Sequence, residues 1–212
     1  MIENQIVDYS ELNKDWFKNK RVLDLGCGSG RFSLGFVNLG SKLTCLDQSK
    51  SGLEAVKKTL ANYKNVVYLN ENILKPKKIK KGFYDFIWCF GVVHHTGDTL
   101  KSLKNIKSFL KKDGKVFLMI YGEPITPEDF YEIDVYNTMR SETKSLNFTE
   151  TINYLREKFD SNLIHGYFDA ISPNINELYE YDDIINMLTD LGFINIKKIN
   201  IKSRNHFLTA NI

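Results

Sequence analysis

The sequence predicts an α/β fold in which a parallel sheet is covered by helices on both faces. Apolar runs typical of buried strands alternate with helical patterns of apolar residues over residues 21–121. A glycine-rich turn at residues 26–30 joins the first strand to the first helix. Near the end of the chain, two β-rich runs at residues 193–201 and 205–212 flank a short polar turn, which predicts an antiparallel hairpin. The alternating elements therefore imply a doubly wound sheet that the hairpin extends.

Each element of this fold follows from a local pattern. Five buried strands are expected at residues 22–25, 42–47, 66–69, 85–90 and 116–121. Helices are expected at residues 32–39, 51–60, 99–110 and 182–191. One more helix is expected over residues 9–20, because four apolar side chains recur there at helix-like spacing. Residues 111–115, with the sequence KKDGK, are expected to form a turn.

The composition indicates a globular protein, with 42% hydrophobic and 13% aromatic residues. No apolar run approaches the roughly 20 residues that a membrane-spanning helix needs. The first residues, MIENQIVDYS, lack the basic and apolar parts of a secretory signal, so we expect a cytoplasmic protein without a membrane partner. Three cysteines, Cys27, Cys45 and Cys89, form no CxxC pair; this predicts buried thiols and no metal site.

The net charge of +3 is unevenly distributed along the chain. Residues 1–121 hold 21 Lys and Arg against 11 Asp and Glu, whereas residues 122–183 hold 4 against 14. The simplest interpretation is a difference between solvated faces. Because no continuous basic track results, we do not expect nucleic acid as a partner.

The glycine-rich turn predicts a ligand site, since a helix N-terminus offers free N–H groups and a partial positive charge. A dinucleotide-binding loop would need its third glycine at Arg31, but here it comes one residue earlier, at Gly30. This spacing weakens the dinucleotide interpretation. Asp47 ends the second strand, 19 residues beyond Gly28, where a carboxylate can accept both ribose hydroxyls of an adenosine. Such a carboxylate is also typical of NAD enzymes.

Two motifs resemble one known family. Residues 24–30, DLGCGSG, resemble the first motif of the class I methyltransferases, which use S-adenosylmethionine, and residues 91–98, GVVHHTGD, resemble the GVLHHTxD segment of many small members. The resemblance implies a three-layer doubly wound sheet of seven strands in the order 3-2-1-4-5-7-6, with strand 7 antiparallel and an insertion after strand 5. It also implies that the Gly26 carbonyl accepts a hydrogen bond from the cofactor's ammonium group, and that Asp24 supports this group directly or through water.

The resemblance extends the expected cofactor site to the ends of neighbouring strands. Family members usually have an aspartate where Asn72 stands, to accept from the adenine amino group, while the next backbone N–H, here that of Ile73, serves the ring. The Asn72 carbonyl can accept the same hydrogen bond, and Glu71 is the alternative acceptor. The full set of expected cofactor-binding residues is Asp24, Gly26, Cys27, Gly28, Gly30, Asp47, Gln48, Asn72, Ile73 and Phe90.

His94 and His95 are the candidate catalytic residues, because they follow a central strand and lie beside the glycine loop. A neutral imidazole can take the proton that a hydroxyl acceptor loses. His95 is the better candidate, since it aligns with the histidine that the family's segment most often retains. The alternative is that both histidines only shape the pocket, and no third side chain nearby in sequence supports a metal site.

These expectations combine into one domain, residues 1–212, with an N-terminal helix (1–20), a cofactor-binding core (21–121), an acceptor-binding insertion (122–180) and a terminal helix with hairpin (181–212). The expected activity is methyl transfer from S-adenosylmethionine to a small molecule, such as a sugar or another metabolite with a hydroxyl group. The alternatives are a nicotinamide-dependent oxidoreductase, a tRNA or protein methyltransferase, and a protein that binds adenosine without catalysis. The sequence leaves the oligomeric state open.

Overall fold

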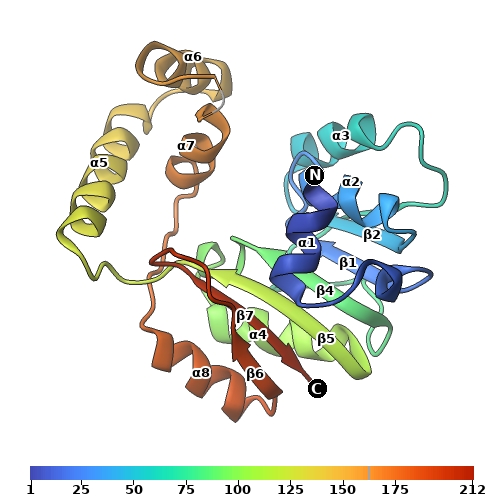
Figure 1. Ribbon diagram of the computed structural model, residues 1–212. Coiled ribbons are helices and arrows are strands. Elements are labelled where there is room, and N and C mark those ends of the chain that lie inside the picture. The colour runs from blue at the N-terminus through green and yellow to red at the C-terminus, as the bar shows by residue number, and fades with distance from the viewer. Residues whose placement is uncertain (162) are drawn as a thin grey trace. The chain divides into compact units, whose positions relative to one another are not determined.

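The computed structural model describes residues 1–161 and 163–212. The chain divides into two compact units, which we call the sheet unit (residues 1–122 and 177–212) and the helical unit (residues 123–176). The sheet unit is built on one seven-stranded sheet in the order β3-β2-β1-β4-β5-β7-β6 (Figure 1). This order, with β7 antiparallel to both of its neighbours, confirms the predicted fold class.

The strands match the apolar runs of the sequence closely. They are β1 (Arg21–Leu25), β2 (Lys42–Asp47), β3 (Val67–Asn70), β4 (Tyr84–Phe90), β5 (Leu110–Ile120), β6 (Ile194–Lys198) and β7 (His206–Asn211). The first five are parallel, so the carboxyl ends of β1, β2 and β4 meet at one edge of the sheet. Loops that leave this edge can therefore contribute to one site.

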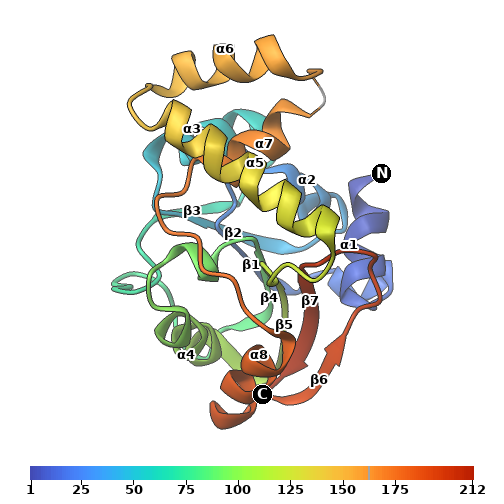
Figure 2. The same cartoon turned by 90° about the vertical axis from the view of Figure 1, so that its left-hand side faces the viewer.

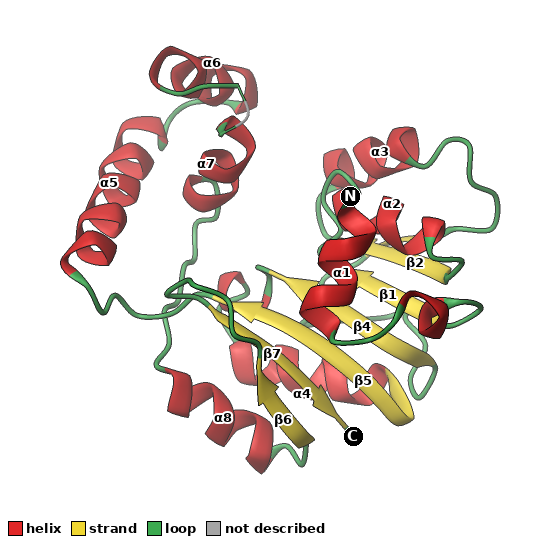
Figure 3. Cartoon of the chain, in the orientation of Figure 1, coloured by secondary structure: helices red, strands yellow, loops and turns green. Residues whose placement is uncertain are grey.

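Helices cover both faces of the sheet, as the ribbon and the secondary-structure view show (Figures 1 and 3). On one face lie α1 (Ile2–Ser10), α2 (Arg31–Asn38) and α3 (Lys50–Thr59), whose Ile6, Phe36 and Val56 are fully buried. On the other face lie α4 (Thr99–Phe109) and α8 (Tyr181–Asp190), which bury a second apolar core against the sheet. A sheet that is apolar on both faces explains the near-continuous hydrophobic runs of its central strands.

The helix predicted over residues 9–20 is wrong. The helix α1 ends at Ser10, Glu11 follows in the left-handed conformation at φ 54°, and residues 14–17 form a separate 3₁₀ turn, η1 (Lys14–Phe17). Asn13 caps this turn by accepting the Trp16 N–H at 2.8 Å. The helical repeat is carried instead by Ile2, Ile6 and Tyr9, one residue from each turn of α1.

The turn predicted at residues 111–115 is also wrong, because these residues belong to β5. The pairing of β5 with β4 is irregular there: Tyr84 lies opposite Leu110, whereas Phe86 lies opposite Lys115. Asp113 adopts the left-handed conformation at φ 62° within the irregular stretch. Residues of the KKDGK type thus form a bulge at the start of a strand rather than a separate turn.

The helical unit consists of α5 (Pro127–Thr143), α6 (Phe148–Lys158) and α7 (Ile164–Ile171). Reciprocal side-chain caps begin two of these helices: Thr126 with Asp129 on α5 and Asn147 with Glu150 on α6. The three helices share a small core made of Met139, Leu155, Ala170 and Ile171. Figure 2 shows the three helices in a second view. None of the helices in residues 1–161 and 163–212 is long and apolar enough to cross a membrane.

Candidate cofactor and acceptor site

The glycine loop between β1 and α2 is held against β2 by its backbone. The N–H groups of Gly26 and Cys27 both donate to the Leu46 carbonyl, at 2.7 and 3.1 Å. Three glycines of the loop have positive φ, at 73° for Gly26, 50° for Gly28 and 88° for Gly30. Glycine adopts this backbone conformation without steric cost, which other residues do not.

The three glycines differ in how closely the surrounding residues pack against them. A Cβ on Gly26 would lie 2.3 Å from a Val92 methyl, and one on Gly30 would lie 2.5 Å from a Val56 methyl. Packing therefore excludes a side chain at both positions. A Cβ on Gly28 would meet no atom within 4 Å. The outer face of the loop at Gly28 is thus open to a ligand, and the residues present fit the backbone approach that the cofactor requires.

Asp47 lies beside this open face, at the end of β2. Its Oδ2 atom accepts the Gly28 N–H at 2.9 Å and its Oδ1 atom accepts the Ser49 N–H at 2.8 Å. The two hydrogen bonds fix the orientation of the carboxylate before any ligand arrives. Because each carboxylate oxygen has a further lone pair, both can still accept from a pair of hydroxyls.

Asp47 is accordingly expected to be the main polar anchor of the cofactor. In Asp47→Ala, the ribose hydroxyls lose a charged acceptor, so binding of S-adenosylhomocysteine is expected to weaken by roughly 1.5–3 kcal/mol. Calorimetric titration measures this loss. Asp190→Ala removes an exposed carboxylate at the end of α8 and serves as the control. Equal affinities of the two variants would contradict the assignment of Asp47.

The predicted adenine contacts lie in the loop after β3. The Asn72 carbonyl oxygen accepts the Leu74 N–H at 2.7 Å, and its amide nitrogen donates to the exposed Gln48 side chain at 3.3 Å. Ile73 is buried, and its own carbonyl accepts from Asn105 at 2.7 Å. Gln48, which follows β2, and Asn72 and Ile73, which follow β3, therefore lie at the carboxyl edge of the sheet near Asp47.

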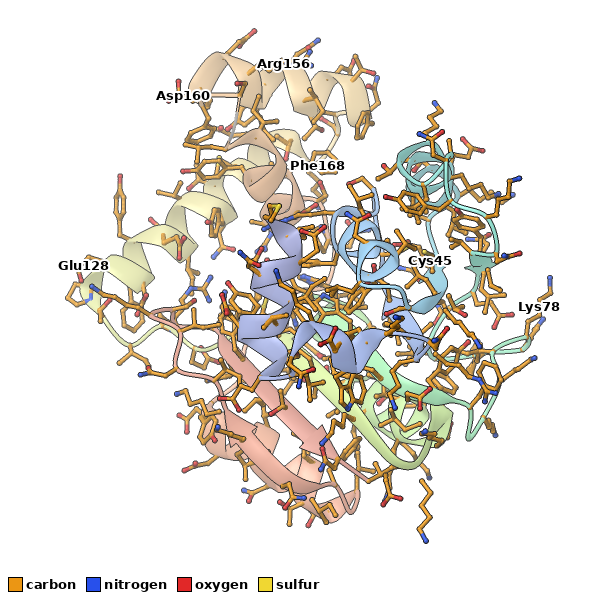
Figure 4. All side chains as sticks on the ribbon, turned by 45° about the vertical axis from the view of Figure 1, so that its right-hand side comes forward. Cys45, Lys78, Glu128, Arg156, Asp160 and Phe168 are labelled. Atoms are coloured by element: carbon orange, nitrogen blue, oxygen red, sulfur yellow. The ribbon has the colours of Figure 1, made fainter. Side chains whose placement is uncertain are left out.

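Glu71 has a different role in the structure. Its carboxylate is buried and accepts the N–H groups of Lys77, Lys78 and Ile79 at distances of 2.9–3.3 Å. This arrangement fixes the basic loop after β3, from which Lys78 points outward (Figure 4). Glu71 thus anchors a loop, and Asn72 is the better placed of the two to meet an adenine.

Asp24 lies on β1 beneath the glycine loop and is buried. Its partner is the Ser33 hydroxyl of α2, which donates to Oδ2 at 2.5 Å. Burial, together with the negative charge of Asp47, raises the pKa of Asp24 to about 7, although the Ser33 hydrogen bond acts in the opposite direction. A positive group bound at the loop would favour the charged form of this carboxyl.

Cys27, Cys45 and Cys89 are free and buried, as the sequence predicts. The pKa of Cys27 is raised by a hydrogen bond with Cys45 and by burial, and burial raises the pKa of Cys89. Thiols of this kind are unreactive. Among the described residues, no group of three His, Cys, Asp or Glu side chains could hold a metal ion.

Phe90, at the end of β4, packs against Phe32 with ring centroids 4.9 Å apart.

The two histidines lie on η2 (Val93–His95), a 3₁₀ turn directly after β4, but in different environments. His94 is fully buried, and neither ring nitrogen has a hydrogen-bond partner among the described residues. Burial, with His95 and Arg204 nearby, lowers the pKa of His94 to about 2, so this ring stays neutral. His95 is half-buried, and its ring meets the Tyr121 ring edge-on at 5.3 Å. His95 is therefore the better placed of the two to reach an acceptor.

Several polar residues that no sequence motif predicts surround the histidine turn. Tyr121 follows β5 and stacks on His94 with ring centroids 4.1 Å apart, and Arg204 donates to the Gly122 carbonyl at 2.8 Å. Glu177 and Tyr179 lie on the segment that returns from the helical unit. No local motif marks these residues, because sheet topology alone brings them to the ends of β4 and β5.

Residues 23–118 match the model of a methyltransferase domain. The matched stretch contains the glycine loop, Asp47 and the histidine turn. This stretch is therefore similar to a methyltransferase domain, and the resemblance to the class I methyltransferases, the class that uses S-adenosylmethionine, is confirmed.

Curated relatives agree with this class. The ubiquinone biosynthesis O-methyltransferase of Pelagibacter ubique is 31% identical over 118 residues, which cover 55% of this chain and 48% of the relative. Its counterpart in Vibrio parahaemolyticus is 29% identical over 104 residues, which cover 49% of this chain and 44% of the relative. The chain thus spans about half the length of the curated relatives it matches.

Solved structures share the fold. The 1,6-didemethyltoxoflavin-N1-methyltransferase of Burkholderia thailandensis, solved with 1,6-didemethyltoxoflavin and S-adenosylhomocysteine, superposes with a TM-score of 0.61 at 14% identity, covering 96% of this chain and 76% of that one. An O-methyltransferase family protein from the same organism superposes with a TM-score of 0.68 at 16% identity, covering 99% of this chain and 55% of that one. At these identities the similarity establishes the fold alone.

Proposed function

We propose that this protein is a cytoplasmic methyltransferase that transfers the methyl group of S-adenosylmethionine to a hydroxyl of a small molecule. The observation that carries the proposal is the open face of Gly28 beside the oriented Asp47 carboxylate. The cofactor would supply the methyl group on a sulfonium, which is already a good leaving group. Gly26, Gly28 and Asp24 would hold its methionyl part, and Asp47 its ribose.

A small hydroxyl acceptor is supported by two observations. The curated relatives that the chain matches are named O-methyltransferases. The helical unit holds 10 Asp and Glu against 4 Lys and Arg, a balance that disfavours a nucleic acid partner. We propose that residues 122–180 provide acceptor recognition, since insertions after β5 leave from the carboxyl edge of the sheet.

Calorimetry and methyl transfer test the proposal together. S-adenosylhomocysteine is expected to bind in a one-to-one complex, whereas NAD is expected to bind weakly or not at all. Labelled S-adenosylmethionine is then offered with panels of phenols, sugars and other hydroxylated metabolites, and methylated products are identified by mass spectrometry. Binding of NAD in preference to S-adenosylhomocysteine would overturn the proposal in favour of an oxidoreductase.

In this proposal, the chain's own residues align the acceptor and accept its proton. Displacement at the sulfonium methyl needs an aligned acceptor and exclusion of water rather than a strong acid. A hydroxyl must lose its proton during the attack, and a half-buried imidazole suits this task at neutral pH. His95 is the proposed base, whereas the buried His94 ring supports the turn.

His95→Gln is expected to lower kcat by roughly 100-fold, which is the lower end of what a general base contributes. The affinity for S-adenosylhomocysteine is expected to stay within twofold of the wild-type value, about 0.4 kcal/mol, because the ring is proposed to meet the acceptor. In the wild-type enzyme, kcat is expected to fall as pH drops through the range in which an imidazole takes up a proton. Full turnover of the variant on the true acceptor would refute the role of His95 as a base.

A further inference from the structure

A short segment of the sheet unit, residues 177–179, ties together the ends of three strands. Glu177 donates its backbone N–H to the His94 carbonyl at 2.9 Å, and Tyr179 donates its own to the Tyr121 carbonyl at 3.1 Å. The Tyr179 carbonyl is 2.8 Å from the Nε2 atom of His206, the first residue of β7. The segment therefore contacts the histidine turn after β4, the end of β5 and the start of β7.

The Glu177 side chain adds a second attachment to the histidine turn. Its Oε2 atom accepts from the Thr99 hydroxyl at 3.0 Å and from the Tyr179 hydroxyl at 2.8 Å. The Thr99 oxygen also lies 2.9 Å from the Val93 carbonyl, within the turn itself. Glu177 is thus connected to the turn by its backbone, through His94, and by its carboxylate, through Thr99.

The position of the carboxylate suits its charge. Thr99 is the first residue of α4, where unpaired N–H groups and the helix dipole favour a negative group. Hydrogen bonds to a carboxylate are stronger than those between neutral groups. Glu177 can therefore hold Thr99, and with it the start of α4, more firmly than a neutral side chain can.

The histidine turn needs such support. The turn η2 has only three residues, and a single 3₁₀ turn is marginal without tertiary contacts. It is preceded by Val92 at φ −126° and ψ −53°, outside the β-region of the strand that it follows. The orientation of His95 thus depends on contacts made to its neighbours Val93 and His94, and Glu177 provides or organises contacts to both.

We propose that Glu177 is a positioning residue that holds His95 in the orientation needed for proton transfer. This inference rests on the proposed function, in which His95 is the base. Glu177 does not touch the acceptor; it acts through the backbone of the turn and through Thr99. Because Glu177 is the first residue of the sheet unit after the helical unit, the chain contacts the histidine turn as soon as it leaves the helical unit.

Kinetics of single and double variants test the proposal. Glu177→Ala is expected to lower kcat by roughly 10- to 100-fold, since small misplacements of catalytic groups cost this much. The affinity for S-adenosylhomocysteine is expected to stay unchanged. Glu177→Gln keeps the shape and one acceptor oxygen, so it is expected to restore most of kcat. Asp190→Ala serves as the control, because Asp190 is an exposed carboxylate at the end of α8, outside residues 122–180.

The double variant separates positioning from a merely structural role. If Glu177 acts through His95, Glu177→Ala with His95→Gln is expected to be no slower than His95→Gln alone. The proposal would be overturned if the loss of kcat in the double variant equals the product of the losses in the two single variants. A wild-type kcat in Glu177→Ala would overturn it as well. A fall in cofactor affinity equal to the fall in kcat would overturn it too, since general loosening of the site predicts that pattern.

A spectroscopic measurement on the free protein does not depend on turnover. Glu177→Ala is expected to shift the imidazole NMR signals of His95 and to speed amide exchange at His95 and Thr96, which donate to Val92 and Val93. If the wild-type chain transferred no methyl group, the proposed function would fail, whereas the positioning would still be judged by these signals. Unchanged His95 signals in Glu177→Ala would overturn the inference in either case.

Discussion

Gly28→Val is expected to abolish binding of S-adenosylhomocysteine while the protein remains folded. A Cβ at Gly28 would meet no protein atom within 4 Å, so we expect the valine branches beyond it to extend into the space proposed for the cofactor. Overpacking of this kind costs about 3 kcal/mol at the upper end for a protein core, and a ligand can escape it by dissociating. A cost of this size corresponds to an expected loss of affinity of about 150-fold.

Gly82→Val is the matched control for this prediction. Gly82 also has an open surrounding and a positive φ, 58° against 50° at Gly28, so both variants carry a similar backbone strain. Gly82 precedes β4, at the opposite edge of the sheet from the glycine loop. Circular dichroism and thermal unfolding report the strain, and calorimetric titration reports binding. A folded Gly28→Val variant with wild-type affinity would show that the loop is not the site.

The parts of the fold that sequence predicted well are those set by local pattern. The strands β1, β2 and β4 are buried on both faces, so most of their residues are apolar. Between β1 and β2, the positive φ values of Gly26, Gly28 and Gly30 explain why the turn that follows β1 contains three glycines. Strand order followed from the family resemblance, because local patterns carry no record of which strands pair.

The two errors arose where a local pattern was read over the wrong span. The repeat that builds α1 starts at Ile2, and Trp16 and Phe17 contact the core from the 3₁₀ turn that follows. In the KKDGK segment, turn-type residues bulge within a strand because Leu110 already pairs with β4. In both cases tertiary packing decided between two arrangements that local propensity left open.

The residues of the candidate site also fall into those that local sequence predicts and those that it does not. Asp47 and the glycine loop could be placed from sequence, since the ends of adjacent parallel strands lie together. Glu71 and Asn72 could not be separated until Glu71 was found to hold a loop six to eight residues further along the chain. Glu177 lies 78 residues from Thr99 in sequence, and no local pattern links the two.

Asp24→Asn is expected to stabilise the free protein at neutral pH, with an effect that grows as pH rises. Because burial raises the pKa of Asp24 from 3.8 to about 7, the folded state binds a proton over a pH range in which the unfolded state has released it. The wild-type free energy of unfolding therefore falls between about pH 4 and pH 7 through this group. The full change corresponds to roughly 4 kcal/mol.

Urea unfolding between pH 4 and pH 8 measures this linkage. An asparagine keeps the shape of the neutral carboxyl and an acceptor for the Ser33 hydroxyl, so the two proteins are expected to be equally stable near pH 4. The described groups around Asp24 are Ser33 of α2, Cys45 and Trp88 on the adjacent strands, and Asp47, and none of these is a cation that would offset its charge.

Asp85→Asn is expected to change the stability of the protein in the opposite direction. Burial of Asp85 is outweighed by its ion pair with Lys111 and by the Arg21 N–H at 2.8 Å, so the pKa of Asp85 is lowered. Its stabilisation is present above the ordinary carboxyl pKa and is lost as pH falls through the lowered value. Asp85→Asn is therefore expected to destabilise the protein at neutral pH, where Asp24→Asn stabilises it. For Asp24, the contradicting result would be a free energy of unfolding that changes with pH in the same way in the wild type and in Asp24→Asn. That result would show that Asp24 does not titrate between pH 4 and pH 7.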